Sequence, residues 1–126
     1  MCARRQVLVI EDAPALRLLF RQVLEDAGYA VDTAIHGGDA LQQLSTLRPC
    51  LILLDLRMPV TDGWQFARAY RQLPAADAHL IGVTSEYNNP RLSELGAVAI
   101  IPKPFELEAL LATVATWVQA HRPGTP

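Results

Sequence analysis

The chain has 126 residues, of which 51% are hydrophobic, and 11 Lys and Arg against 13 Asp and Glu give a formal net charge of -2. This length and apolar content are enough for one domain with a hydrophobic core, and the weak charge, without a run of Lys and Arg, argues against direct binding of nucleic acid or of an anionic membrane. Because no apolar run approaches a membrane span or the core of a signal peptide, we expect a cytoplasmic protein.

Five short apolar segments have the character of β-strands. They lie near residues 6–11, 30–35, 50–55, 79–84 and 98–102, and helical patterns separate them. Repeated alternation of strand and helix is typical of a parallel sheet with right-handed crossovers. The third segment has four apolar residues in a row, which indicates a strand that is buried on both faces. The sequence therefore predicts a (βα)5 fold of the α/β class around this strand.

The first and last helices have the clearest patterns. In the first, Pro14 suits the first turn and Gly28 follows the end. Its apolar residues recur at helical spacing: Leu16, Leu19, Phe20, Val23, Leu24 and Ala27. The last helix follows Pro104 and carries a similar stripe: Leu107, Leu110, Leu111, Val114 and Val118.

The helices between them are less regular. A second helix is expected to begin near Gly37, and a third to run over about 63–73 with Thr61 or Asp62 as its cap. Turn-forming residues occupy most of the segment after the fourth strand, so only about 91–95 remains for a fourth helix. We therefore expect that helix to be short.

The chain has two cysteines, Cys2 and Cys50. They are far apart in the sequence and lack the spacing of a metal site. We therefore expect reduced thiols, as is usual in the cytoplasm, with Cys50 at the start of the third strand.

Polar side chains follow four of the predicted strands. Glu11 and Asp12 come after the first strand, Asp55 ends the third, Thr84 ends the fourth and Lys103 follows the fifth. Because parallel strands share one carboxyl edge, where open α/β sheets bind ligands, these groups should gather there. A carboxylate can accept a phosphoryl group if positive charge offsets the repulsion between the two anions. The set suits a divalent cation and a phosphoryl group.

With this combination the chain resembles the receiver domain of a two-component response regulator. The resemblance rests on these residues and on Met58-Pro59, Gly63 and Pro104-Phe105, and it spans essentially the whole chain. It implies a flavodoxin-like three-layer sandwich whose parallel sheet has the strand order 2-1-3-4-5. It also implies a receiver domain over residues 4–121, with 122–126 as a flexible tail or the start of a linker.

The resemblance assigns the central role to Asp55, as the acceptor of a phosphoryl group from a phosphohistidine on a sensor histidine kinase or a histidine phosphotransfer protein. Asp12 and Asp55, with the main-chain carbonyl of Arg57, would bind Mg²⁺ or Mn²⁺ directly. Glu11 would assist through a water molecule. The implied protein is a bacterial phosphoprotein of a two-component system or phosphorelay.

The switch residues implied by the resemblance follow the fourth and fifth strands. Lys103, before a cis peptide bond to Pro104, would bind the phosphoryl oxygens, and Thr84 would move toward them. Arg57 and Glu86 each lie two residues beyond a key group. We hypothesise that their side chains screen the phosphoryl group and influence its lifetime; the alternative is that both point to solvent.

Two departures from the family pattern concern the switch. Ile100 stands three residues before Lys103, where such domains often carry a Tyr or Phe whose ring follows the switch Thr. An aliphatic side chain cannot report by that ring movement. The segment between Thr84 and Lys103 is also about one helical turn shorter than is common. We expect a remodelled output face.

Two enzyme or cofactor classes are disfavoured. Phosphatases of the haloacid dehalogenase type also place a nucleophilic Asp after a parallel strand, but they need a second Asp two residues on, where this chain has Arg57. A flavin-binding module would want a Ser-, Thr- or Gly-rich phosphate loop after the first strand, where Glu11-Asp12 would repel phosphate. We expect a protein that is not an enzyme beyond catalysing its own phosphorylation and dephosphorylation.

The output stays open from the sequence. The chain could be a stand-alone regulator, a phosphorelay shuttle, or a receiver from a larger regulator or hybrid kinase. Residues 13–20 and the loop at 104–105 are the surfaces next to Asp55 where partner specificity is expected. A dimer that depends on phosphorylation is a further expectation.

Overall fold

The computed structural model describes residues 5–56, 60–74, 76–86 and 88–120, and for 60–62 only the backbone. Its strands pair in parallel in the order β2-β1-β3-β4-β5. They are β1 (Gln6–Ile10), β2 (Ala30–Ala34), β3 (Leu51–Asp55), β4 (His79–Thr84) and β5 (Ala99–Pro102). This confirms the predicted sheet and its strand order, with β3 at the centre.

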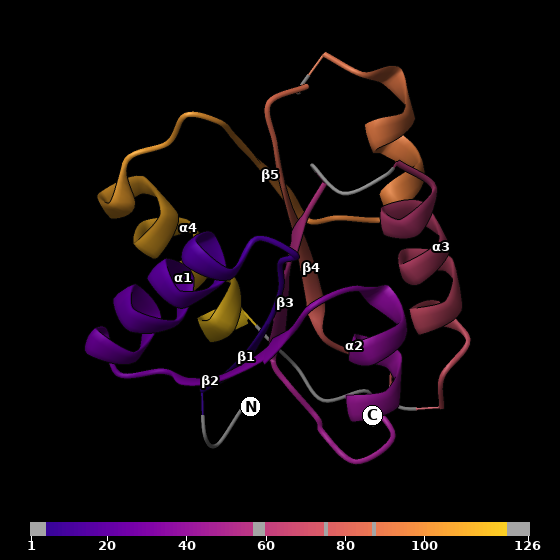
Figure 1. Ribbon diagram of the computed structural model, residues 1–126, viewed down its shortest axis with the longest axis horizontal. Helices are drawn as coiled ribbons and strands as arrows, with labels where there is room; N and C mark the ends of the chain where they lie inside the picture. The colour runs from indigo at the N-terminus through magenta and orange to yellow at the C-terminus, as the bar shows by residue number, and fades with distance from the viewer. Residues whose placement is uncertain (1–4, 57–59, 75, 87, 121–126) are drawn as a thin grey trace.

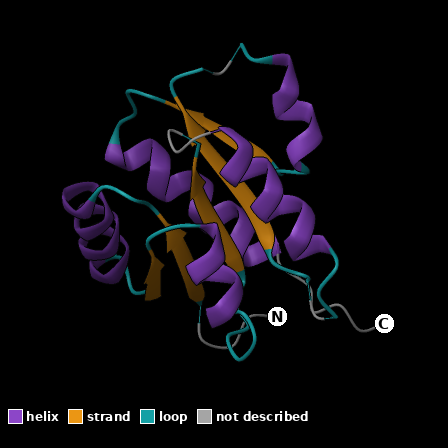
Figure 2. Ribbon diagram, turned by 45° about the vertical axis from the view of Figure 1, so that its right-hand side comes forward, coloured by secondary structure: helices purple, strands orange, loops and turns teal. Residues whose placement is uncertain are grey.

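The helices cover both faces of the sheet and make the three layers visible in Figures 1 and 2. One layer holds α1 (Pro14–Asp26) and α4 (Leu107–Ala120), and the other holds α2 (Gly37–Gln43) and α3 (Val60–Arg71). A 3-10 helix, η1 (Pro90–Leu95), stands where the short fourth helix was expected and lies beside α3. The crossovers between parallel strands thus place helices on both faces of the sheet (Figure 1).

The core has two halves, one on each face of the sheet, because successive side chains of a strand point to opposite faces. All five residues of β3 are buried. Leu51 and Leu53 pack with the α1 and α4 side, whereas Ile52 and Leu54 pack with the α2 and α3 side. Each such side chain contributes about 1.5–3 kcal/mol on burial. This double coverage holds the end of β3, and with it Asp55, in a fixed place.

Three members of the predicted apolar stripes are exposed: Leu19, Leu107 and Ala27, which is the C-cap of α1. Leu19 in α1 and Leu107 in α4 are 40% and 41% exposed, so their assignment to the core is wrong. In α1 the buried positions are Phe20 and Leu24, and Leu19 lies at the edge of the stripe. Leu107 is the first residue of α4, where the helix has only begun to cover the sheet.

The third helix begins at Val60 rather than near Gly63, so Thr61 and Asp62 lie inside it and cannot be its cap. Gly63 has a packing reason instead. A Cβ atom at this position would lie 2.8 Å from the Cδ2 atom of Leu56. Gly63 therefore lets α3 approach the residue that directly follows Asp55.

The short η1 segment is attached to α3 at both ends. The indole Nε1–H of Trp64 donates to the carbonyl oxygen of Arg91 at 2.8 Å. The guanidinium of Arg71 donates to the carbonyl oxygens of Glu94, at 3.1 Å, and of Leu95. The Arg71 contacts occupy carbonyl groups that the end of a helix leaves without an internal partner. They fasten η1 to α3 although η1 is too short to bury a wide apolar face.

Cys50 lies just before β3, and its backbone N–H donates to the carbonyl oxygen of Gln6 at 2.9 Å. Its side chain is buried and disulfide-bonded, so the prediction of a reduced thiol is wrong for this residue. The other cysteine, Cys2, lies outside the described residues.

Candidate functional site

The acid pair lies at the carboxyl end of β1 and is held by its backbone. The N–H of Glu11 donates to the carbonyl oxygen of Ala34, at the end of β2, at 3.0 Å. Glu11 is fully buried, and its Oε2 atom accepts from the N–H of Ala13 at 3.0 Å. Asp12 is exposed. The two carboxylates therefore meet the site from different depths.

Asp55 is the last residue of β3 and is only 1% exposed. The ammonium group of Lys103 donates to its Oδ1 atom at 2.8 Å. Lys103 reaches this place because its N–H donates to the carbonyl oxygen of Thr84 at 2.8 Å, which continues the β4 and β5 pairing. The peptide bond between Lys103 and Pro104 is cis, as the resemblance implies. A buried carboxylate and a fixed cation thus share one contact.

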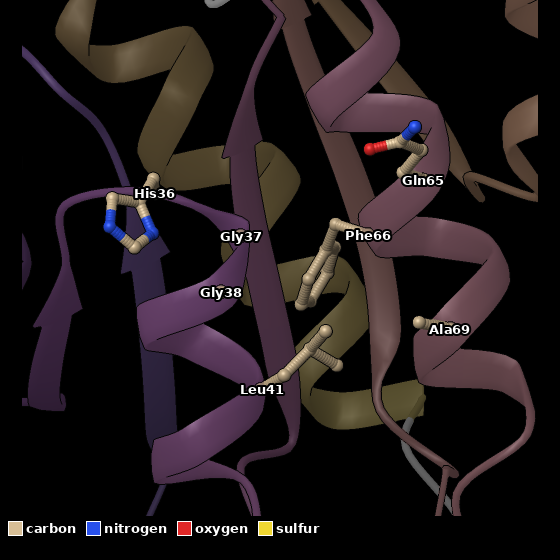
Figure 3. A pocket seen from close by; sticks show the side chains of 7 residues that line it. All are labelled: His36, Gly37, Gly38, Leu41, Gln65, Phe66 and Ala69. Atoms are coloured by element: carbon tan, nitrogen blue, oxygen red, sulfur yellow. The ribbon is translucent and has the colours of Figure 1, made fainter.

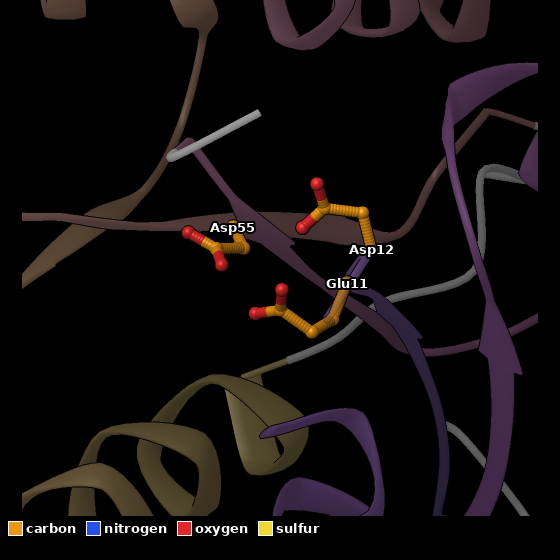
Figure 4. Close-up of side chains that lie close together, drawn as sticks. All are labelled: Glu11, Asp12 and Asp55. Atoms are coloured by element: carbon orange, nitrogen blue, oxygen red, sulfur yellow. The ribbon is translucent and has the colours of Figure 1, made fainter. Parts of the chain in front are cut away.

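Each of Glu11, Asp12 and Asp55 offers one carboxylate oxygen within 4.8 Å of the others. Figure 4 shows the three side chains turned toward a common space. Burial raises the pKa of Glu11 to about 8, and the neighbouring carboxylate of Asp55 adds to the shift. Three crowded carboxylates are stable together only when protons or a cation offset their charge. This oxygen-only set fits a hard divalent cation such as Mg²⁺, with water completing the shell.

Thr84 ends β4 on the same edge and is 3% exposed. Its Oγ1 atom accepts from the backbone N–H of Glu86 at 2.9 Å. Glu86 itself is exposed. Arg57 lies outside the described residues, so its carbonyl as a metal ligand and its side chain opposite Glu86 stay predictions.

Ile100 of β5 is half-buried and lies beside Gly82 of β4. A Cβ atom at Gly82 would be 3.0 Å from the Cδ1 atom of Ile100 and 3.1 Å from that of Leu56. The absence of a side chain at Gly82 lets both aliphatic side chains lie over β4. Leu56 directly follows Asp55. Ile100, at the position where such domains often carry an aromatic residue, therefore lies over β4 together with a direct neighbour of the phosphoacceptor candidate.

Sequence reasoning missed Leu56, Gly82 and Arg17. The Nη1 atom of Arg17, in the first turn of α1, donates to the carbonyl oxygens of Glu11 at 3.0 Å and of Asp12 at 3.4 Å. On the helical pattern alone Arg17 belongs to the solvent face. Its spacing from the acid pair was the one available signal, because a residue in the first helical turn can reach back to the end of the preceding strand.

A groove of about 300 Å³ lies elsewhere, between α2 and α3. Figure 3 shows Leu41 and Phe66 facing each other across it, with His36 near one end. None of the predicted site residues is among those that line it: His36, Gly37, Gly38, Leu41, Gln65, Phe66 and Ala69. The acid cluster is therefore separate from this groove.

The arrangement of the acids, the Lys and the Thr at the carboxyl edge of a parallel sheet defines a phosphoacceptor type of site, and comparison with known proteins gives the family. The model of the response regulator receiver domain matches residues 7–115. The chain belongs to this family, and its acid cluster fits the phosphorylation site of such domains.

Two curated relatives illustrate the range of proteins that contain similar domains. The response regulator MprA of Mycobacterium avium is 32% identical over 94% of this chain, and the hybrid signal transduction protein dokA of Dictyostelium discoideum is 30% identical over 98%. The chain spans 53% of MprA and 8% of dokA. The similarity thus concerns one domain of longer proteins.

Solved structures agree with the fold. The chemotaxis response regulator CheY4 of Vibrio cholerae has a TM-score of 0.82 and 30% identity, over 91% of this chain and 99% of that one. The receiver domain of the sensor histidine kinase PA1611 of Pseudomonas aeruginosa, solved with a magnesium ion in its active-site cleft, has a TM-score of 0.83 and 25% identity, over 93% and 99%. Within the described residues, no helix is both long and apolar enough to cross a bilayer.

Proposed function

We propose that Asp55 accepts a phosphoryl group from a phosphohistidine on a sensor histidine kinase or a histidine phosphotransfer protein. The observation that carries the proposal is the position of Asp55 between the ammonium group of Lys103 and the carboxylates of Glu11 and Asp12. One oxygen of Asp55 forms a bond to phosphorus while the bond from phosphorus to the donor imidazole breaks, and the electron pair returns to that nitrogen. Water later hydrolyses the acyl phosphate and restores the carboxylate.

The same proposal assigns Mg²⁺ or Mn²⁺ to Asp12, Asp55 and the Arg57 carbonyl as direct ligands, with Glu11 assisting through a water molecule. The magnesium ion in the PA1611 receiver supports this assignment. When bound, the cation would offset the charge of the acids and of the incoming phosphoryl group. Two features of the chain itself would assist. Burial limits the access of bulk water to Asp55, and Lys103 places a positive charge at the Oδ1 atom of Asp55.

In the proposed switch, Thr84 exchanges its hydrogen bond from the Glu86 N–H for one to the phosphoryl group, and Lys103 moves from Asp55 to the phosphoryl oxygens. The two-state equilibrium of the domain then shifts because these contacts exist only after phosphorylation. Arg57 and Glu86 would influence the lifetime of the acyl phosphate. The proposed receiver domain spans residues 4–121, and its proposed location is the cytoplasm.

The output partner differs between two versions of the proposal. In one, the domain passes its conformational change to another protein or to a further domain of a larger regulator; in the other, it is a phosphorelay shuttle that only transfers the phosphoryl group. Relatives of both a response regulator and a hybrid type are similar to the chain. A dimer that forms on phosphorylation belongs to the first version and would be seen by size exclusion with beryllofluoride.

The experiment is phosphorylation of the purified chain by acetyl phosphate and by a histidine kinase, with and without Mg²⁺, followed by intact-mass measurement. The wild-type protein should gain one phosphoryl group that requires Mg²⁺ and is lost at alkaline pH. Asp55→Asn should gain none, whereas Asp26→Asn, at the exposed end of α1, should behave as the wild type. No gain with either donor, or an equal gain in Asp55→Asn, would refute the proposal.

A further inference from the structure

Arg17 occupies an unusual place for a surface-type residue of a helix. It is the fourth residue of α1, and its side chain is half-buried rather than extended into solvent. Its Nη1 atom reaches back over the start of the helix to two successive carbonyl oxygens, 3.0 Å away at Glu11 and 3.4 Å away at Asp12. One nitrogen therefore contacts the backbone of both acids that follow β1.

The choice of carbonyl oxygens matters chemically. A guanidinium this close to three acids could pair with a carboxylate, and it would then remove an oxygen from any cation that the site binds. Within the described residues, the hydrogen bonds of the Arg17 side chain go to main-chain oxygens. Arg17 thus brings a permanent positive charge to the acid pair without occupying a carboxylate, since guanidinium is not deprotonated in proteins.

Glu11 and Asp12 differ in how the rest of the chain holds them. Glu11 is buried, and its N–H and its Oε2 atom both have backbone partners, Ala34 and Ala13. Asp12 is exposed at the point where the chain leaves the sheet and has not yet entered α1. The repulsion between the carboxylates of Asp12 and Asp55, which offer oxygens within 4.8 Å of each other, would favour a swing of this loop outward. The Arg17 contact opposes that movement.

We propose that Arg17 is a positioning residue that sets the affinity of the acid cluster for a divalent cation by holding the Glu11-Asp12 backbone. The inference rests on the proposed function, because it takes the cluster to be a cation site. Arg17 touches neither the cation nor the phosphoryl group. Its effect passes through the carbonyl oxygens to the position of the Asp12 carboxylate.

The test compares Arg17→Gln and Arg17→Lys with a matched control, Arg21→Gln. Arg21 lies one turn further along α1 and pairs with Glu25 on the exposed surface at 3.3 Å. The dissociation constant for MgCl₂ is measured by calorimetry, and the free energy of unfolding is measured in urea without divalent cations. The second measurement separates positioning from a merely structural role.

We expect Arg17→Gln to weaken Mg²⁺ binding about tenfold to a hundredfold, which is typical when a partner behind a metal ligand is lost. Arg17→Lys should bind less tightly than the wild type and more tightly than Arg17→Gln, and Arg21→Gln should bind as the wild type does. In an Asp12→Asn background the effect of Arg17→Gln should shrink, because the two residues act on the same ligand.

The outcomes distinguish the two proposals. If the wild-type protein does not bind Mg²⁺, the proposed function fails at its cation site. If the wild type binds but both Arg17 variants have its affinity, the positioning role is overturned and the proposed function stands. If Arg17→Gln weakens Mg²⁺ binding by the same factor in the Asp12→Asn background as in the wild type, the positioning role is also overturned. If Arg17→Gln fails to fold, Arg17→Lys decides alone: wild-type affinity for Mg²⁺ in this variant overturns the positioning role.

Discussion

The site has two halves that differ in how closely they follow the family pattern. The acidic half comprises Glu11, Asp12 and Asp55 at the ends of the adjacent strands β1 and β3. The switch half comprises Thr84, Ile100 and Lys103 on or after β4 and β5. The acidic half has three carboxylate oxygens within 4.8 Å of one another, as the resemblance implies, whereas the switch half has Ile100 at the position where such domains often carry an aromatic residue.

This difference has a physical explanation. The acidic half must direct its carboxylate oxygens toward one point. Small displacements of these side chains would therefore prevent them from binding one cation together. The switch half needs two packed arrangements that are close in free energy, and it has no single point on which its atoms must converge. Leu56 lies between the halves, since it follows Asp55 and would meet a Cβ at both Gly63 and Gly82.

The largest effect is expected from removing the positive charge of Lys103, the residue of the switch half that contacts Asp55 in the acidic half. Lys103→Met should slow phosphorylation of Asp55 by acetyl phosphate by about a hundredfold or more, because a preorganised charge at the reacting group is lost. Initial rates at saturating Mg²⁺ measure this. Arg48→Met, at a surface remote from Asp55, is the control. A rate within twofold of the wild type would mean that the halves are chemically independent.

The pH dependence of stability tests the acidic half alone. With a pKa of 4.5 in the unfolded chain and about 8 in the folded one, Glu11 holds a proton between these values only when folded. In the absence of divalent cations, the free energy of unfolding should therefore fall as the pH rises from about 4.5 to 8, and the Glu11 penalty should be complete above that range. Mg²⁺ affinity should rise over the same interval, because binding displaces the proton.

Glu11→Gln should remove this slope, and Glu25→Gln, on the exposed surface of α1, should keep it. Urea unfolding at several pH values checks both variants. A slope that is the same in Glu11→Gln and the wild type would assign the proton to another group.

A smaller effect is expected from filling the space over β4. Gly82→Ala should destabilise the protein by about 1–3 kcal/mol, because the added methyl group meets Ile100 and Leu56. Ile100→Val in the same chain should recover part of the loss. Gly38→Ala is the control, since its Cβ would have only ordinary contact with His36 at 3.4 Å. If Gly82→Ala also weakens Mg²⁺ binding, the two halves are coupled through Leu56.

Much of the fold was predictable because its signals are local. Apolar runs of strand length, separated by helical spacing, were sufficient for the number and direction of the strands. Since parallel strands end at one edge, the polar residues after them could be brought together without coordinates: Glu11, Asp12, Asp55, Thr84 and Lys103. Their contacts in the structure, such as Lys103 with Asp55, follow from that rule.

Other features of the structure depend on which helices and strands come into contact. The periodicity of the sequence does not predict these contacts. Gly63 was taken for the start of a helix, but it is an interior residue that gives room to Leu56. Arg17 lies outside the apolar stripe of the first helix, yet its side chain contacts the backbone of the acid pair. Cys50 was expected to be reduced and is disulfide-bonded.

The amino-acid sequence alone determined the class of fold, the edge of the sheet that carries the chemistry and the residues found there, because these depend on the order of short segments along the chain. Only the tertiary structure decided how η1 is fastened to α3 through Trp64 and Arg71, and which side chains lie over Gly82. Such contacts join residues far apart in sequence, and their distances are set by the packing of whole elements against one another.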